Sequence, residues 1–105
     1  MGGSSVDYMW RHFNTLGTIG SENGKIMADE EYKNSCRITL EKCERYYAVT
    51  CGVYGSMIHT AFTDDAHCWK TYNAIKNDLQ TFIDNIECMT EIEIEQFYDE
   101  FTSTY

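Results

Sequence analysis

Near the N-terminus, apolar residues recur every three or four positions, a spacing typical of an amphipathic helix. Ser5 would cap this helix and Gly17 would end it. We therefore expect a short N-terminal helix, preceded by a flexible lead at residues 1–5 that takes no part in the fold. The residues of its buried face would be Val6, Met9, Trp10, Phe13 and Leu16.

The period changes from about four to two after Cys36, which indicates strands instead of helices. Two runs alternate apolar and polar residues, 36–40 and 47–53, and residues 56–62 form a third candidate strand. Turn residues separate the three runs at Glu44-Arg45 and Tyr54-Gly55. This region predicts an antiparallel β-meander.

Residues 25–34 fit either a strand or a helical turn, because Ile26-Met27 favours the first and the acidic stretch after Ala28 the second. The preceding Asn23-Gly24 pair is a strong turn signal. If it closes a hairpin, this segment adds a fourth strand to the sheet.

A helical period returns after Asp64 and Asp65, either of which can cap a long helix. Thr90 and Glu93 then have the spacing of a capping box, so a last helix should begin there. The expected fold is α+β in one domain, 1–105: an N-terminal helix, a three- or four-stranded antiparallel β-meander, and two C-terminal helices packed on one sheet face. The inward residues of the two C-terminal helices would be Trp69, Tyr72, Ile75, Leu79, Phe82, Ile83 and Ile86, then Ile94, Phe97, Tyr98 and Phe101.

Charge is distributed very unevenly along the chain. After Lys76 there is no Lys or Arg, whereas eight of the 17 acidic residues lie in that stretch, so the net charge of -9 belongs mainly to the C-terminal end. A one-sided negative field attracts basic partners and repels nucleic acid and anionic membranes. Direct nucleic-acid binding and membrane association are therefore disfavoured.

On the last helix, Glu91, Glu95 and Asp99 would form a column at i, i+4 and i+8. Like charges at this spacing repel by about 0.2–0.5 kcal/mol per pair, which is consistent with a surface kept for a basic partner. A solvated face that only aids solubility explains the same pattern. The candidate partner-binding residues are Asp84, Glu87, Glu91, Glu95, Asp99 and Glu100.

The sequence therefore favours a small cytoplasmic interaction protein, an inhibitor or nucleic-acid mimic that blocks a basic surface of a partner, for which a nucleic-acid-binding protein is the natural candidate. Phage anti-CRISPR proteins, DNA mimics and toxin-neutralising immunity proteins act in this general way and are analogies only, since no motif identifies them here. Exposed tyrosines near the turns would suit such a recognition surface. A homo-oligomer whose acidic face is its exposed side is a further possibility.

The five cysteines include no CxxC pair, and no run of residues resembles a signal peptide or a membrane span. A reducing setting with free core thiols is the simplest interpretation. Zinc ligands usually come in pairs two to four residues apart, and the acidic segments lack the loop of an EF-hand. We therefore expect no metal and no cofactor.

The alternative function is a small enzyme or ligand-binding domain with its site near Cys51 and His59. These residues lie on adjacent predicted strands, so a cysteine and its activating base could meet across a hairpin. Whether both side chains share one face depends on the strand register, which the pattern does not determine.

Overall fold

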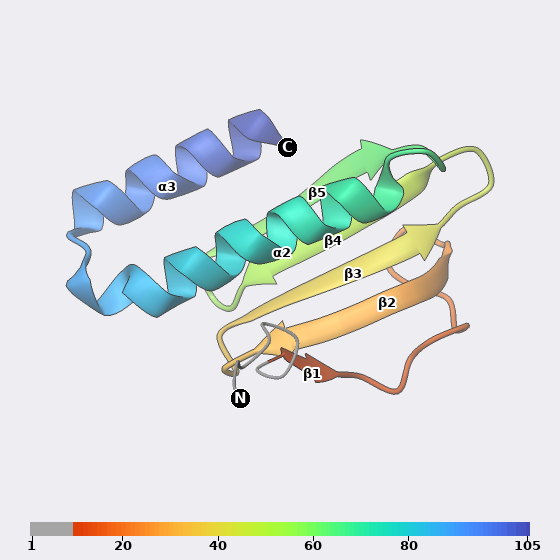
Figure 1. Cartoon of the computed structure of the whole chain (residues 1–105), viewed down its shortest axis with the longest axis horizontal. Coiled ribbons are helices and arrows are strands. Elements are labelled where there is room, and N and C mark those ends of the chain that lie inside the picture. Colours follow the sequence, from red (N-terminus) through yellow and green to blue (C-terminus); the bar gives the residue numbers. More distant parts are fainter. Residues whose placement is uncertain (1–9) are drawn as a thin grey trace.

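The computed structural model describes residues 10–105, in which a five-stranded antiparallel sheet precedes two helices (Figure 1). The strands follow one another in the sheet in chain order, so the topology is a simple meander. The elements are β1 (Trp10–His12), β2 (Lys25–Tyr32), β3 (Cys36–Lys42), β4 (Tyr47–Val53), β5 (Met57–Thr63), α2 (Cys68–Asn85), the 3₁₀ turn η1 (Ile86–Cys88) and α3 (Glu91–Thr104).

The predicted N-terminal helix is wrong. Its first residues, Ser5, Val6 and Met9, lie outside the described residues, but Trp10 begins β1, which pairs with the end of β2. The apolar residues do not share one helical face: Trp10 is 3% exposed and stacks on Tyr32, whereas Leu16 is 65% exposed. Tertiary pairing with β2 therefore overrides the local helical spacing.

In the described part of the chain the sheet has five strands, where three or four were expected. Residues 25–32 form β2, so the strand interpretation of the ambiguous segment holds, and β1 is the strand that the pattern missed. The Asn23-Gly24 turn precedes β2 as predicted, with Asn23 at a φ of 62°. The turns at Glu44-Arg45 and Tyr54-Gly55 also join the strands that they were expected to join.

The turn that precedes β2 surrounds a buried carboxylate. Glu41 is fully buried and accepts hydrogen bonds from the backbone N–H groups of Glu22 and Gly24, both at 3.1 Å. A side chain at Gly20 would come within 2.5 Å of the Glu41 carboxyl carbon, so the close approach requires glycine there. The turn is thus anchored to β3 by a charged group inside the protein.

The acidic run of β2 is buried, which explains why its pattern was ambiguous. Successive side chains of a strand alternate between faces, so Glu30 faces α2, whereas Asp29 and Glu31 face the opposite side. Glu30 accepts hydrogen bonds from the Tyr72 hydroxyl at 2.5 Å and the Lys76 ammonium at 2.8 Å. Asp29 accepts from Arg37 and Glu31 accepts from Arg11, so each of the three buried carboxylates has a partner, as burial requires.

The core lies between the sheet and α2. One face of the central strands packs against the apolar stripe of α2, as the sequence predicted for Tyr72, Ile75 and Leu79. Trp69, also expected inward, is 46% exposed and covers the edge of Tyr72. The core residues of the sheet on this face are Trp10, Tyr32, Cys36, Ile38, Leu40, Tyr47, Val49, Cys51, Val53 and Ala61.

The capping predictions differ in outcome for the two helices. The N-cap of α2 is His67, not Asp64 or Asp65, although Asp64 accepts a hydrogen bond from the His67 backbone N–H at 3.0 Å. At α3, the Thr90 side chain accepts from the Glu93 N–H and the Glu93 carboxylate accepts from the Thr90 N–H, so the capping box is confirmed.

No helix within residues 10–105 combines the length and the apolar character that crossing a bilayer would require.

Candidate interaction surface

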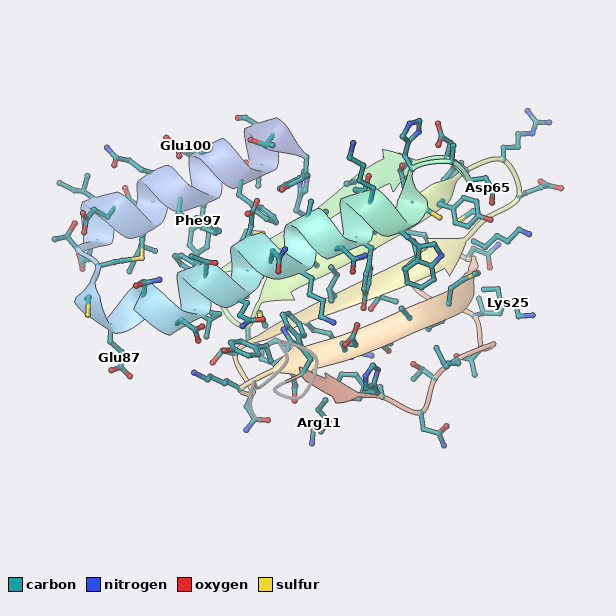
Figure 2. All side chains as sticks on the ribbon, viewed as in Figure 1. Arg11, Lys25, Asp65, Glu87, Phe97 and Glu100 are labelled. Atoms are coloured by element: carbon teal, nitrogen blue, oxygen red, sulfur yellow. The ribbon has the colours of Figure 1, made fainter. Side chains whose placement is uncertain are left out.

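Helix α3 is attached to the rest of the protein by a row of aromatic rings. Phe97 stacks on Phe82 of α2 with 4.0 Å between the ring centroids, and Phe101 lies next along the row. Figure 2 shows Phe97 pointing from α3 into the space between the two helices. Phe101 is the one fully buried residue of α3, whereas α2 has seven. The attachment is therefore narrow, and most of α3 remains accessible.

The carboxylates of α3 point to solvent. Glu91, Glu95 and Asp99 are all exposed and lie along one side of the helix, as their spacing predicted. Glu100 follows Asp99 and so lies about 100° further round the helix. Within residues 10–105 none of these four forms an ion pair, so their charges are not neutralised internally.

The two remaining candidates, Asp84 and Glu87, lie before α3 and differ from each other. The Asp84 carboxylate accepts hydrogen bonds from the Tyr32 hydroxyl at 2.6 Å and the Lys33 ammonium at 3.0 Å. These two bonds hold the pKa of Asp84 below its ordinary value. Glu87 is exposed in η1 and points away from the body of the protein (Figure 2). Asp84 therefore ties α2 to the β2–β3 turn, and Glu87 is free to meet a partner.

Cys51 and His59 are brought together by the fold. They are directly opposite each other in the β4–β5 ladder, and both face the helices. Burial raises the pKa of the Cys51 thiol to about 12, so at neutral pH the sulfur is protonated and weakly nucleophilic. The His59 ring packs edge-on against Phe101, and its Nε2 has no hydrogen-bond partner among the described residues. The positions of Cys51 and His59 fit a catalytic dyad, but the burial of the Cys51 thiol does not, because it keeps the sulfur protonated.

The other four cysteines differ in how deeply they are buried. All five cysteines are free; Cys36 and Cys68 are buried like Cys51, Cys43 is half-buried and Cys88 is exposed. Burial raises the pKa of Cys36 to about 12 as well. In residues 10–105, no three His, Cys, Asp or Glu side chains are grouped closely enough to hold a metal ion.

The sheet face opposite the helices carries a polar network that the sequence analysis missed. Asp29 is 1% exposed and accepts hydrogen bonds from Arg37, Thr15 and Thr39. Burial opposes ionisation of Asp29, but these bonds outweigh it and hold its pKa below the ordinary value. Once residues 25–32 are assigned to a strand, the alternation of side chains between the two faces is the signal that could have placed Asp29 and Arg37 on the same face.

Beside this network, the same face exposes apolar side chains at β5. Ile58 and Phe62 are 84% and 63% exposed, and their partners on β4 are the small residues Gly52 and Ala48. An open groove of about 230 Å³ runs next to Ile58 and is lined by apolar atoms and by Arg37. Large apolar side chains that are exposed and grouped in a patch are typical of interaction sites.

The tyrosines near the turns are divided. Tyr46 and Tyr54 are 40% and 48% exposed, and Tyr46 contacts Phe62 edge-on with 5.3 Å between ring centroids. Tyr47 is buried, and its hydroxyl donates to Asp65 at 2.8 Å. Tyr46 therefore extends the exposed apolar surface of β5, whereas Tyr54 lines the groove next to Ile58 and donates a hydrogen bond to Glu31.

Comparison with known proteins finds no matching family model, no matching curated protein and no matching solved structure.

Proposed function

We propose that this protein is an interaction module that binds a basic surface of another protein through the carboxylates of α3. The observation that carries the proposal is that Glu91, Glu95, Asp99 and Glu100 are exposed on one helix and have no ion-pair partner within residues 10–105. Carboxylates form strong, often bidentate hydrogen bonds with Arg and Lys. The partner would therefore present a cluster of those residues.

A nucleic-acid-binding protein is the partner class that this chemistry favours. Its Arg and Lys side chains are arranged to hold phosphates, and a helix bearing several carboxylates offers anionic oxygens at repeated intervals. Occupying such a surface would exclude DNA or RNA by direct competition, which would make the protein an inhibitor. Of the six candidate residues, Asp84 contributes least to the proposal because it is already bound to Tyr32 and Lys33.

The test compares two double variants that remove the same charge from different places. Glu95→Gln/Asp99→Asn removes two carboxylates from α3, and Glu22→Gln/Glu44→Gln removes one from the β1–β2 connection and one from the β3–β4 turn. The probe is an octa-arginine peptide, whose dissociation constant is measured by calorimetry at two salt concentrations. Exposed ion pairs contribute about 0.2–1 kcal/mol each, so the α3 variant should bind about 2- to 30-fold more weakly.

Two results would contradict the proposal. If both double variants weaken binding equally, overall charge is responsible and α3 is not a site. If binding of the unmodified protein does not weaken between 0.1 M and 1 M salt, where the Debye length falls from about 10 Å to about 3 Å, it is not electrostatic. Competition between the protein and DNA for a basic DNA-binding domain then tests the inhibitor function separately.

The alternative function, an enzyme or ligand-binding site near Cys51 and His59, has weaker support. The two side chains are cross-strand neighbours, but the thiol is buried, and Phe101 of α3 covers the His59 ring. Alkylating the thiols would remove activity at such a site while leaving partner binding by α3 unchanged.

A further inference from the structure

β5 is an edge strand whose outer backbone groups have no partner in the described part of the chain. Within residues 10–105, β5 is the last strand of the sheet and pairs only with β4. Outside that ladder, no backbone hydrogen bond joins residues 57–63 to another residue of the range 10–105. An edge of seven residues is long enough to template another strand.

This edge also lacks the features that usually protect an edge strand. The sequence Met-Ile-His-Thr-Ala-Phe-Thr contains no Lys, Arg, Asp, Glu or Pro. The opposite edge, β1, is only three residues long and includes Arg11 and His12. Charges, proline and shortness are the common means by which proteins prevent edge pairing. Of the two edges of this sheet, β5 is therefore the one open to strand addition.

The side chains of β5 provide a surface for an added strand on the side away from the helices. Ile58 and Phe62 point to this side, two positions to either side of Thr60, which contacts Thr50. An added antiparallel strand would place alternate side chains within about 4.5–5.5 Å of them. Apolar residues at those alternate positions would bury both exposed side chains.

On the other side, α3 extends beyond the edge of the sheet. Figure 1 shows α3 lying outside β5, with no strand beneath most of its length. Its C-terminal part meets the sheet where Phe101 contacts His59, whereas Glu91 and Glu95 lie on its first turns. Residues of an added strand that point to the helix side would therefore face a helix rich in carboxylates.

We propose that the partner binds by adding an extended segment to β5 as a sixth strand, with apolar residues at alternate positions and Lys or Arg between them. The apolar residues cover Ile58 and Phe62, and the basic residues reach the carboxylates of α3. The expectation that the segment is basic rests on the proposed function. The new element is that the partner docks through backbone pairing with β5.

A second copy of the chain fits this edge poorly. Antiparallel pairing of β5 with β5 from another copy places both helical layers on the same face of the joined sheet. The two α3 helices would then approach each other across the junction, each carrying unpaired carboxylates. Like charges in such an interface oppose association.

The test uses the full chain and two peptides of identical composition. The first is acetyl-Lys-Val-Lys-Val-Lys-Val-Lys-amide, and the second has the same residues in the order Val-Val-Val-Lys-Lys-Lys-Lys. Both carry the same charge, but only the first has the alternation of a strand. We expect the first peptide to slow amide hydrogen exchange within residues 57–63 by about tenfold or more, and the second to leave it unchanged.

Matched variants separate the apolar contact from general effects. Ile58→Thr/Phe62→Thr removes the exposed side chains of β5 while keeping residues that favour strands. Leu16→Thr/Ile19→Thr removes side chains of similar exposure from the β1–β2 connection. The β5 variant should raise the dissociation constant of the alternating peptide by about tenfold relative to the control variant.

Each outcome decides between the two proposals. If both peptides bind equally, β5 amides are not protected and Glu95→Gln/Asp99→Asn weakens the binding of both, strand addition is wrong while binding through α3 stands. If β5 is protected but Glu95→Gln/Asp99→Asn has no effect on binding, the role of α3 is wrong. A doubling of the mass of the free protein in sedimentation, lost in the β5 variant, would assign the edge to a second copy and overturn this inference.

Discussion

The carboxylate of Asp29 accepts two parallel hydrogen bonds from the guanidinium of Arg37, at 2.8 Å from Nε and 2.6 Å from Nη2. This pair joins β2 to β3 on the face that the helices leave uncovered. Asp29 is almost fully buried, whereas 42% of the Arg37 side chain is exposed and its guanidinium lies over the Phe13 ring. The bidentate geometry is the strong form of a charge-assisted contact.

Replacing Asp29 with Asn should destabilise the fold by about 2–4 kcal/mol. Arg37, Thr15 and Thr39 all donate hydrogen bonds to the Asp29 carboxylate, and a neutral amide removes the negative charge that these donors meet. Urea unfolding at pH 7 measures this. Glu44→Gln, at an exposed turn position, is the control and should change stability by less than about 0.5 kcal/mol. Equal stability of the two variants would show that the pair is not needed.

The same site predicts a dependence of stability on pH. The pKa of Asp29 is lower in the folded protein than its ordinary value of 3.8, so folding favours the ionised form. This contribution is fully present above the unfolded pKa and is lost as the pH falls below 3.8 through the folded pKa. Between pH 5 and pH 2, Asp29→Asn should therefore lose less stability than the unmodified protein; parallel losses would contradict the assignment.

β1 can be tested by comparing two residues of the segment that the sequence assigned to a helix. Trp10 is buried, stacks on Tyr32 and donates a hydrogen bond from Nε1 to Gln80 at 2.9 Å. Trp10→Ala should cost about 3–5 kcal/mol. Leu16→Ala should cost less than about 0.5 kcal/mol because Leu16 is largely exposed. Comparable losses, measured by thermal or urea unfolding, would favour the helix.

The capping box of α3 links stability to the proposed site. Thr90→Ala removes the acceptor for the Glu93 N–H and should cost about 1 kcal/mol. Because α3 has a single fully buried residue, much of this loss should appear as fraying of its first turn, seen as faster amide exchange there. Thr102→Ala, near the other end of α3, should leave that exchange unchanged; a global loss instead would mean that α3 and the sheet unfold as one unit.

Thiol reactivity should follow burial. The pKa values of Cys36 and Cys51 are raised to about 12, and both side chains are in the core, so iodoacetamide at pH 8 should not modify them in the folded protein. Exposed Cys88 should react readily. Mass mapping after a short exposure measures the order. Early modification of Cys51 would indicate an accessible, activated thiol and would favour the alternative function.

Several elements could be predicted from the sequence because they depend on local chemistry. The alternation in β3 and β4, the turns between the strands, and the apolar stripes of α2 and α3 all follow from side-chain periodicity. The capping box spans only four residues, and both of its predicted hydrogen bonds are present. The exposure of Glu91, Glu95 and Asp99 also follows from their spacing along the helix.

Other features could not be predicted because they depend on partners distant in the chain. β1 is stable only because β2 lies beside it, and the helical spacing from Trp10 to Leu16 does not reveal that pairing. Three consecutive acidic residues are acceptable in β2 because Arg37, Lys76 and Arg11 meet them from other elements. Nor does spacing show that β5 is an open edge next to α3.

By itself, the sequence determined where the charge lies and which faces of the main strands and helices are apolar, since both depend on residue order alone. Only the tertiary structure decided which of those groups remain available. It buried the acidic residues of β2 among specific partners, placed Cys51 and His59 opposite each other on the helix side of the sheet, and left both the carboxylates of α3 and the apolar side chains of β5 exposed. The physical reason is that desolvation and pairing depend on neighbours in space, which a linear pattern does not contain.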